Sequence, residues 1–210
     1  MHPFLRYRAK FLAVLVLAGC AVAGTNFVRP DDNAYTLGKT TRAQLLASFS
    51  AARLGAEAET GETQSRASGK TLKYFTYGFA TRAPSDHPGG IAARTQTFYF
   101  YDDVLVARQF TSSFVTDSSD WDETKVKDLV KGVTTRAEVV EMLGRPSGAY
   151  IWPAVSRTHG EAIGYHHTYI TTPLTGLIHV RVRHSKHLIV TFDGADRVED
   201  VEFRQGSRSE

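Results

Sequence analysis

The feature that most constrains the fold of this chain is an internal repeat. Residues 38–46 (GKTTRAQLL) and 132–140 (GVTTRAEVV) share a glycine, two threonines, an arginine and an alanine at matching positions. Further on, residues 98–103 (FYFYDD) parallel residues 189–194 (IVTFDG), because each alternates like a β-strand and runs into an acidic turn. A repeat on this scale indicates two copies of one folding unit. We therefore predict a first unit over residues 34–116, a second over 117–206 and a C-terminal tail at 207–210.

Each repeat carries a signal for the start of a helix. Thr41 with Gln44, and Thr135 with Glu138, have the spacing of a capping box, in which side-chain oxygens satisfy unpaired backbone amides of the first helical turn. Apolar residues at helical spacing follow both boxes. A further short helix is predicted over residues 122–130, separated by a turn from the second box. The sequence therefore predicts a helix-turn-helix arrangement.

Segments typical of β-strands follow the helices in each unit, with Gly- and Pro-rich connections between them. The predicted strands lie at residues 71–80, 95–102, 104–110, 149–155, 163–171, 177–183, 187–192 and 198–203. The polar stretches 56–69 and 82–94 are predicted to be loops. The predicted fold class is therefore α+β, with two tandem units that each combine a helix-turn-helix with an antiparallel sheet.

The N-terminus has the three parts of a secretion signal. Arg6, Arg8 and Lys10 form a basic stretch, residues 11–18 form an apolar run, and a small-residue site follows. A membrane-spanning helix is the alternative, but it needs about 20 apolar residues and this run is shorter. We therefore predict that residues 1–19 are the signal peptide of an exported protein.

Removal of this signal changes the charge of the protein. The formal net charge of the whole chain is +3, and Arg6, Arg8 and Lys10 account for all of that excess. A protein that tracks nucleic-acid phosphates needs a basic surface for its affinity. The mature chain is formally neutral, so nucleic acid is excluded as its expected partner.

Residues 17–20 (LAGC) resemble the lipobox of bacterial lipoproteins. This resemblance implies cleavage between Gly19 and Cys20 and acylation of Cys20, which would anchor the mature protein in a membrane. Ala21, where an aspartate would imply inner-membrane retention, implies sorting to the outer membrane. Cys20 is the only cysteine, so no internal disulfide is expected. Residues 20–33, which are small, polar and interrupted by proline, are predicted to form a tether.

The second repeat resembles the SmpA/OmlA (BamE-like) family of outer-membrane lipoproteins. Residues 131–146 (KGVTTRAEVVEMLGRP), 188–194 (LIVTFDG) and 198–201 (VEDV) are similar to the family's helix and to the sheet that follows it. The first repeat departs from the pattern, because residues 50–52 (SAA) stand where its LGxP ending would be. The tandem form resembles the beta-lactamase inhibitor protein. The resemblance implies an accessory role in β-barrel assembly or a scaffold for envelope integrity.

No pattern in the chain indicates catalysis or metal binding. His166 and His167 are adjacent, so on a strand they face opposite sides and cannot bind one ion together. The chain contains neither the His-Glu spacing of a zinc site nor a nucleophile elbow, and its only thiol is assigned to lipidation. The sequence therefore predicts no enzyme activity, no metal and no cofactor.

The aromatic strands provide a candidate binding surface. Phe98 and Phe100 share one face of their predicted strand, while Tyr99 and Tyr101 share the other, and Tyr74 takes the corresponding place on the preceding strand. Tyrosine supplies contact area at low entropic cost and is enriched at interfaces. We therefore name Tyr74, Tyr99 and Tyr101 as candidate partner-binding residues. The alternative is that these tyrosines cover a solvated sheet or a contact between the two units.

These observations together predict a function that depends on contact rather than catalysis. We expect an outer-membrane lipoprotein, anchored by its N-terminal lipid on the periplasmic face, that binds a protein partner in the envelope as a scaffold. A membrane-tethered inhibitor of a periplasmic or secreted enzyme is the alternative.

Overall fold

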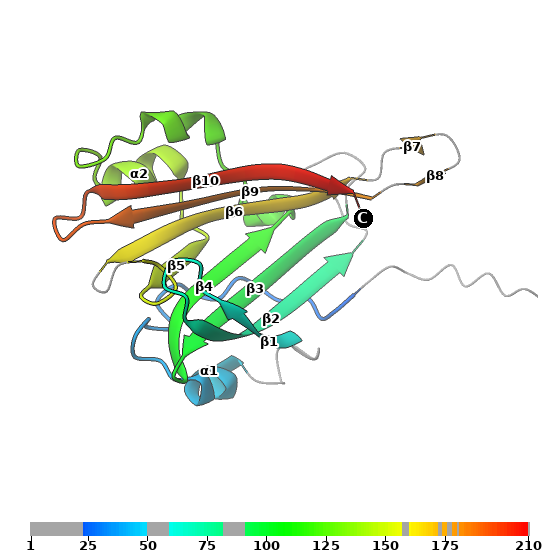
Figure 1. Ribbon diagram of the computed structural model, residues 1–210. Coiled ribbons are helices and arrows are strands. Elements are labelled where there is room, and N and C mark those ends of the chain that lie inside the picture. Colours follow the sequence, from blue (N-terminus) through cyan, green and yellow to red (C-terminus); the bar gives the residue numbers. More distant parts are fainter. Residues whose placement is uncertain are drawn as a thin grey trace, which may run out of the picture.

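A single antiparallel sheet dominates the structure, a computed structural model that describes residues 23–49, 59–81, 91–156, 160–171, 174–175, 178–179 and 181–209. Eight strands pair in the order β1-β2-β3-β4-β5-β6-β9-β10, and β7 and β8 form a separate two-stranded ribbon (Figure 1). The strands are β1 (Glu59–Gln64), β2 (Thr71–Thr81), β3 (Ala92–Tyr101), β4 (Val104–Ser112), β5 (Gly148–Ile151), β6 (Glu161–Thr171), β7 (Leu174–Thr175), β8 (Ile178–His179), β9 (Val182–Phe192) and β10 (Val198–Ser209). The helices are α1 (Arg42–Phe49), α2 (Arg136–Leu143), and the 3-10 helices η1 (Val115–Asp117) and η2 (Glu123–Asp128).

The predicted α+β fold class, with two tandem units that each combine a helix-turn-helix with an antiparallel sheet, is wrong. The predicted helix over residues 122–130 is only the 3-10 helix η2, and α1 and α2 each have 8 residues. The strands of the two predicted units also belong to one sheet, because β4 pairs with β5 from Ala107 opposite Tyr150 to Gln109 opposite Gly148. A separate sheet in each half would expose two more strand edges, and this pairing satisfies their backbone groups instead.

Several predicted strand boundaries also change. Residues 59–64, which we placed in a loop, form β1, an exposed edge strand whose polar sequence ETGETQ has no apolar alternation to reveal it. The predicted strand at 149–155 ends at Ile151 as β5, because the chain then turns. Within the predicted strand at 177–183, the structure places β8 and the start of β9.

The local signals at the two helix starts are confirmed. In α2, the amide of Glu138 donates to Thr135 Oγ1 at 3.3 Å, and Glu138 Oε2 accepts from the amide of Thr135 at 2.7 Å. In α1, Thr41 and Gln44 exchange the corresponding pair of hydrogen bonds at 3.2 and 2.9 Å. Each box satisfies amides that a helix start leaves unpaired.

The matching residues of the sequence repeat make matching backbone hydrogen bonds. The amide of Gly38 donates to the carbonyl of Leu105 at 2.8 Å, and that of Gly132 donates to Val198 at 2.7 Å. Both glycines have positive φ angles, +75° and +73°, which residues with a side chain rarely adopt. The repeat therefore fixes how the segment before each helix joins a strand of the sheet.

The turn between β3 and β4 lies at the predicted acidic pair, Asp102 and Asp103. Asp102 and Asp103 have φ angles of 48° and 60°, so both central residues of this two-residue turn are left-handed. Such turns match the twist of the flanking strands, and aspartate tolerates them better than most residues.

The two faces of the sheet differ in what covers them. We call the face that packs against α1 and α2 the helix face, and the opposite face, which carries Tyr74, Tyr99 and His166, the open face. On the helix face, Leu45 of α1 packs in a buried cluster with Phe98 and other aromatic residues of β2 to β4. The cluster under α2 contains Val139, Leu143, Ile163, Tyr165, Leu188, Val190 and Phe192.

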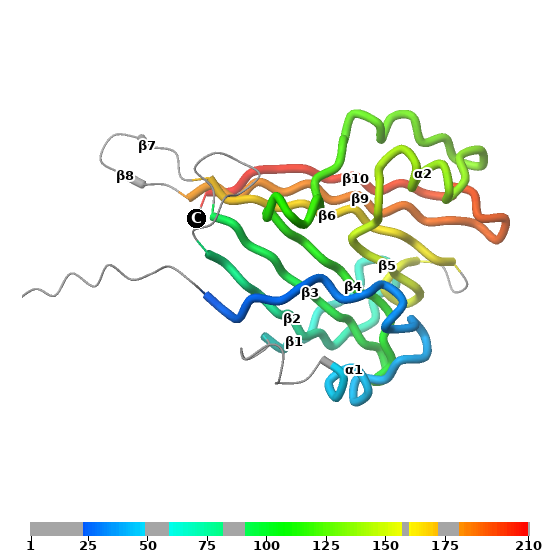
Figure 2. The backbone as a smooth tube through the Cα atoms, turned by 180° about the vertical axis from the view of Figure 1, so that it is seen from behind, coloured from blue at the N-terminus to red at the C-terminus, as the bar shows by residue number. Residues whose placement is uncertain are grey.

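The N-terminal segment of residues 23–34 also lies on the helix face. It crosses β3 and β4 as an extended chain in Figure 2. Phe27, at 7% exposure, joins the core cluster under α1, and Ala23 exchanges two backbone hydrogen bonds with Ala80 of β2, both 2.9 Å. The part of the predicted tether that the structure describes is therefore packed against the sheet.

Candidate functional site

The three candidate tyrosines lie together on the open face. Tyr74 of β2 stands directly opposite Tyr99 of β3, and their ring centroids are 6.2 Å apart. Tyr101 follows on the same face of β3 and contacts Trp152 edge-on at 5.6 Å. The tyrosines and Trp152 are all half-buried. Sequence reasoning missed Trp152, because it placed that residue inside a predicted strand rather than in a loop that folds back over the sheet. We call these four residues the aromatic cluster.

The surroundings of the aromatic cluster hold it in place. Gly61 of β1 lies under the Tyr74 ring, and a Cβ at this position would lie 2.7 Å from the Tyr74 hydroxyl oxygen. The hydroxyls of Ser65 and Ser68 both donate to the carbonyl of Pro153, at 2.6 and 2.8 Å, and so fasten the loop that carries Trp152. Residues of β1, β2, β3 and the loop after β5 are thus needed to build this surface.

A chain of buried and half-buried polar side chains crosses the open face beside the aromatic cluster. The Tyr150 hydroxyl lies 2.5 Å from Nε2 of His166, and Nδ1 of His166 lies 2.9 Å from Nδ1 of His187. Tyr150 and His166 are 6% and 3% exposed. The Tyr150 hydroxyl also reaches Gln109 Oε1 at 3.4 Å. We call Tyr150, His166 and His187 the polar chain; it connects β5, β6 and β9.

Two strand glycines make room for the polar chain. A Cβ on Gly164 would lie 2.4 Å from His166 Nε2, and a Cβ on Gly148 would lie 2.7 Å from the Tyr150 hydroxyl oxygen. Real Cβ atoms essentially never come so close to a neighbouring atom. The glycines on neighbouring strands β5 and β6 are the sequence signal that could have revealed this chain.

The polar chain holds its histidines neutral. Burial, and then the neighbouring His187, lower the pKa of His166 to about 3. Burial and the charge of Arg204 lower the pKa of His187, and burial raises the pKa of Tyr150. In one proton arrangement, Tyr150 donates to His166 and His166 donates to His187, which satisfies both contacts without a charged group. These groups therefore act as a buried network that orders the sheet.

His166 and His167 do face opposite sides of β6. His166 belongs to the polar chain on the open face, while Nε2 of His167 lies 4.0 Å from Asp120 Oδ1 on the helix face.

His167 borders a cavity of about 600 Å³ that Asp120, Glu123 and Lys186 also line. Lys186 contacts both carboxylates, at 2.7 and 2.6 Å, and its ammonium lies 5.0 Å from the Trp121 ring centre. Burial lowers the Lys186 pKa, but its two carboxylate partners outweigh burial and raise it overall.

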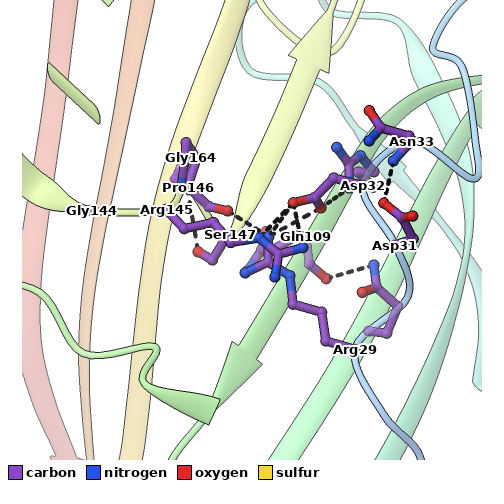
Figure 3. A network of polar contacts seen from close by, with 12 residues as sticks. Arg29, Asp31, Asp32, Asn33, Gln109, Gly144, Arg145, Pro146, Ser147 and Gly164 are labelled. Atoms are coloured by element: carbon purple, nitrogen blue, oxygen red, sulfur yellow. Dashed lines mark hydrogen bonds and ion pairs between the residues drawn. The ribbon is translucent and has the colours of Figure 1, made fainter. Parts of the chain in front are cut away.

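A third group of polar residues lies where the N-terminal segment meets the middle of the sheet. Figure 3 shows side chains converging on the carboxylate of Asp32. Arg29 donates to both oxygens of Asp32 at 3.1 Å, Arg145 Nε donates to Oδ2 at 2.8 Å, and Arg108 donates to Oδ1. Arg29 also donates to the carbonyl of Pro146 at 2.5 Å. We call Arg29, Arg108 and Arg145 with Asp32 the arginine cluster. No spacing in the sequence pointed to it.

The remaining predictions about sites lie outside the described residues or concern absences. The lipidation site Cys20, the cleavage site at Gly19 and Cys20, and the sorting residue Ala21 are outside the part of the chain that the structure describes. Among the described residues, no group of three or more His, Cys, Asp or Glu could hold a metal ion, and no helix is long and apolar enough to cross a membrane.

Comparison with known proteins adds no relative. No protein-family model, no curated protein and no solved structure matches the chain.

Proposed function

We propose that this protein is a lipid-anchored outer-membrane scaffold that binds an envelope protein through the aromatic cluster on the open face of its sheet. The observation that carries this proposal is the grouping of Tyr74, Tyr99, Tyr101 and Trp152, half-buried, on a face that no described helix covers. Tyrosine and tryptophan are the residues most often found as energetic anchors of interfaces. Burial raises the pKa of Tyr99, so this member of the cluster stays neutral.

The aromatic cluster suits protein binding because it is held rigidly. The glycine under Tyr74 and the hydrogen bonds that hold the loop carrying Trp152 fix the rings before any partner arrives. A surface that is already ordered loses less conformational entropy on binding. The small and polar residues nearby, such as Thr76 and Thr97, whose hydroxyls share a hydrogen bond at 2.8 Å, would form a polar border.

A double substitution tests this surface. Tyr74→Ser with Tyr101→Ser removes two aromatic side chains without touching the buried Phe98 face, and should weaken partner recovery about ten-fold or more. The measurement is quantitative recovery of crosslinked partners from detergent-solubilised envelopes. Val130→Ser with Val133→Ser is the matched control, since these valines are 51% and 60% exposed and lie beside α2. Equal recovery from both double variants would reject the open face as the binding surface.

The partner recovered in this experiment also separates the two proposed roles. Barrel-assembly proteins in the recovered material would support a scaffold role. A single soluble hydrolase, whose activity falls when the protein binds it, would support the alternative of a tethered inhibitor.

The lipid anchor is tested by its own pair of variants. Cys20→Ala should leave the precursor uncleaved or release the protein from the outer membrane, because the acylated thiol is lost. Ala21→Asp should keep the anchor but shift the protein to the inner-membrane fraction. Sucrose-gradient fractionation of the envelope measures both results. Full recovery of the Cys20→Ala protein in the outer-membrane fraction would contradict the anchor.

A further inference from the structure

The arginine cluster holds more positive charge than its carboxylate neutralises. Arg29, Arg108 and Arg145 all contact Asp32, so three guanidinium groups share one carboxylate. A simple structural ion pair needs one cation for each anion, and the other two cations repel each other across a short distance. Among the described residues, no second carboxylate pairs with these three arginines. The cluster therefore retains two positive charges.

Another arginine close to the cluster does have its own partners. Arg136 shares a cavity of about 430 Å³ with Arg108 and Asp32. Arg136 contacts Asp196 at 2.7 Å and Glu161 at 3.3 Å, so it does not add to the excess charge. The unmatched charge thus belongs to the arginine cluster itself.

The arginine cluster also has N–H donors that its contacts with Asp32 do not use. A guanidinium has five N–H groups, whereas the contacts with Asp32 use one nitrogen of Arg29, one of Arg108 and two of Arg145. Nε of Arg108 is buried and makes no hydrogen bond within the described part of the chain. An unpaired buried donor is costly, so a ligand that accepted from this group would stabilise it.

Two arginines of the cluster are mostly buried and the third is exposed, and this combination favours the binding of an anion from solvent. The side chains of Arg29 and Arg108 are only 14% and 19% exposed, so solvent screens their charge weakly, whereas Arg145 is 58% exposed. Burial and the charges of Arg145 and Arg108 lower the pKa of Arg29 despite its contact with Asp32. The cavity beside Arg108 leaves room next to the buried end of the cluster.

We propose that the arginine cluster is a binding site for a phosphate group. A phosphate monoester carries close to two negative charges at neutral pH and has three strong acceptor oxygens, so it matches both the excess charge and the spare donors. Arginine binds phosphate through parallel hydrogen bonds and is the residue best suited to that geometry. A second carboxylate would leave one positive charge unmatched. Both free phosphate and a phosphorylated lipid headgroup carry this chemistry.

The site is tested with inorganic phosphate and the full-length protein in a non-ionic detergent. Isothermal titration calorimetry should detect phosphate binding to the wild type, and Arg145→Ser should weaken it about ten-fold. Arg204→Ser is the matched control, because Arg204 is also 58% exposed but pairs with Glu202 on β10. Phosphate stabilises many proteins by exclusion from their surface, and that general effect would be the same in both variants. Equal phosphate affinity in the Arg145→Ser and Arg204→Ser proteins would overturn the proposal.

A second variant moves phosphate affinity in the opposite direction. Asp32→Asn removes the competing carboxylate, raises the excess charge by one and should bind phosphate about ten-fold more tightly, provided its circular dichroism spectrum matches that of the wild type. Weaker binding in a folded Asp32→Asn protein would also overturn the site. If the Asp32→Asn protein does not fold, the comparison of phosphate affinity between the Arg145→Ser and Arg204→Ser proteins still tests the site.

Short-chain phosphatidic acid identifies the source of the phosphate. Affinity for dihexanoyl phosphatidic acid well above that for inorganic phosphate, with none for dihexanoyl phosphatidylcholine, would support a lipid headgroup. Equal affinity for phosphatidic acid and inorganic phosphate would support a soluble phosphate compound. Absence of binding to both phosphate probes would reject the site.

Discussion

Replacement of Gly164 by alanine is expected to destabilise the protein by about 3 kcal/mol, from steric overlap and from the loss of a buried hydrogen bond. The new Cβ would lie 2.4 Å from His166 Nε2 and 2.8 Å from Cε2 of Tyr150. Neither ring can move away easily, because Tyr150 and His166 are both almost fully buried. The contact between these two side chains must then break and leave a polar group without its partner.

Gly206→Ala is the control for this prediction. Gly206 is also a strand glycine, on β10, and a Cβ there would meet nothing within 4 Å. Alanine restricts the unfolded chain more than glycine, so this change should be neutral or stabilising by about 0.5 kcal/mol. Urea unfolding followed by tryptophan fluorescence gives both free energies. A loss below about 1 kcal/mol in the Gly164→Ala protein would show that the polar chain contributes little to stability.

Tyr150→Phe separates the two causes of that loss. This change removes the hydroxyl but adds no atom, so the hydrogen bond to His166 and the longer contact with Gln109 are lost without steric overlap, and the expected cost is about 1–2 kcal/mol. The remainder of the Gly164→Ala effect would then be steric. The comparison assigns the energy of the polar chain to a contact that links β5 with β6.

Features that depend on a few neighbouring residues could be predicted from the sequence. The capping boxes at Thr41 and Thr135 and the tight turn at Asp102 form where the sequence places them, because short-range backbone geometry decides each one. The alternation of Phe98 with Tyr99 likewise assigns their two faces, because side chains on a strand alternate.

The union of the two predicted sheets into one continuous sheet could not be predicted in this way. The β4–β5 pairing includes small residues such as Ala107 and Gly148, and it satisfies the backbone groups of two strand edges. Neither leaves a periodic pattern in the sequence. A pattern that repeats twice along the chain is compatible with two sheets or with one continuous sheet, and only the pairing of distant strands distinguishes them.

The arginine cluster was missed for a similar reason. Its members come from the N-terminal segment, from β4 and from the turn after α2, so no spacing in the sequence connects them. The polar chain left a weak signal in Gly148 and Gly164, but a strand glycine alone does not say which side chain needs the space. Polar networks of this kind follow from the fold and cannot be read before it.

Asp32→Asn should give the second large loss of stability, about 2–3 kcal/mol at pH 7 in the absence of phosphate. The asparagine keeps the shape of the side chain but removes the negative charge that three arginines share. The N-terminal segment would also lose a main attachment to the rest of the protein, since Arg108 and Arg145 both hold it through Asp32. Asp31→Asn is the matched control, because within the described part of the chain its carboxylate accepts only from the nearby amide of Asn33, at 2.9 Å in an exposed turn.

The pH dependence of this loss provides the decisive measurement. Burial alone would raise the pKa of Asp32, but its hydrogen bonds to Arg108 and Arg145 and the charges of Arg108 and Arg29 outweigh burial, and the pKa lies below its usual value. A group whose pKa is lower in the folded state stabilises that state above its unfolded pKa, and this contribution disappears as the pH falls through the folded pKa. The free-energy difference between wild type and Asp32→Asn should therefore be constant from about pH 5 to 8 and shrink below about pH 4. Protonation of His187 affects both proteins equally and cancels in the difference. A difference that stays unchanged down to about pH 2 would mean that the charge of Asp32 does not stabilise the fold.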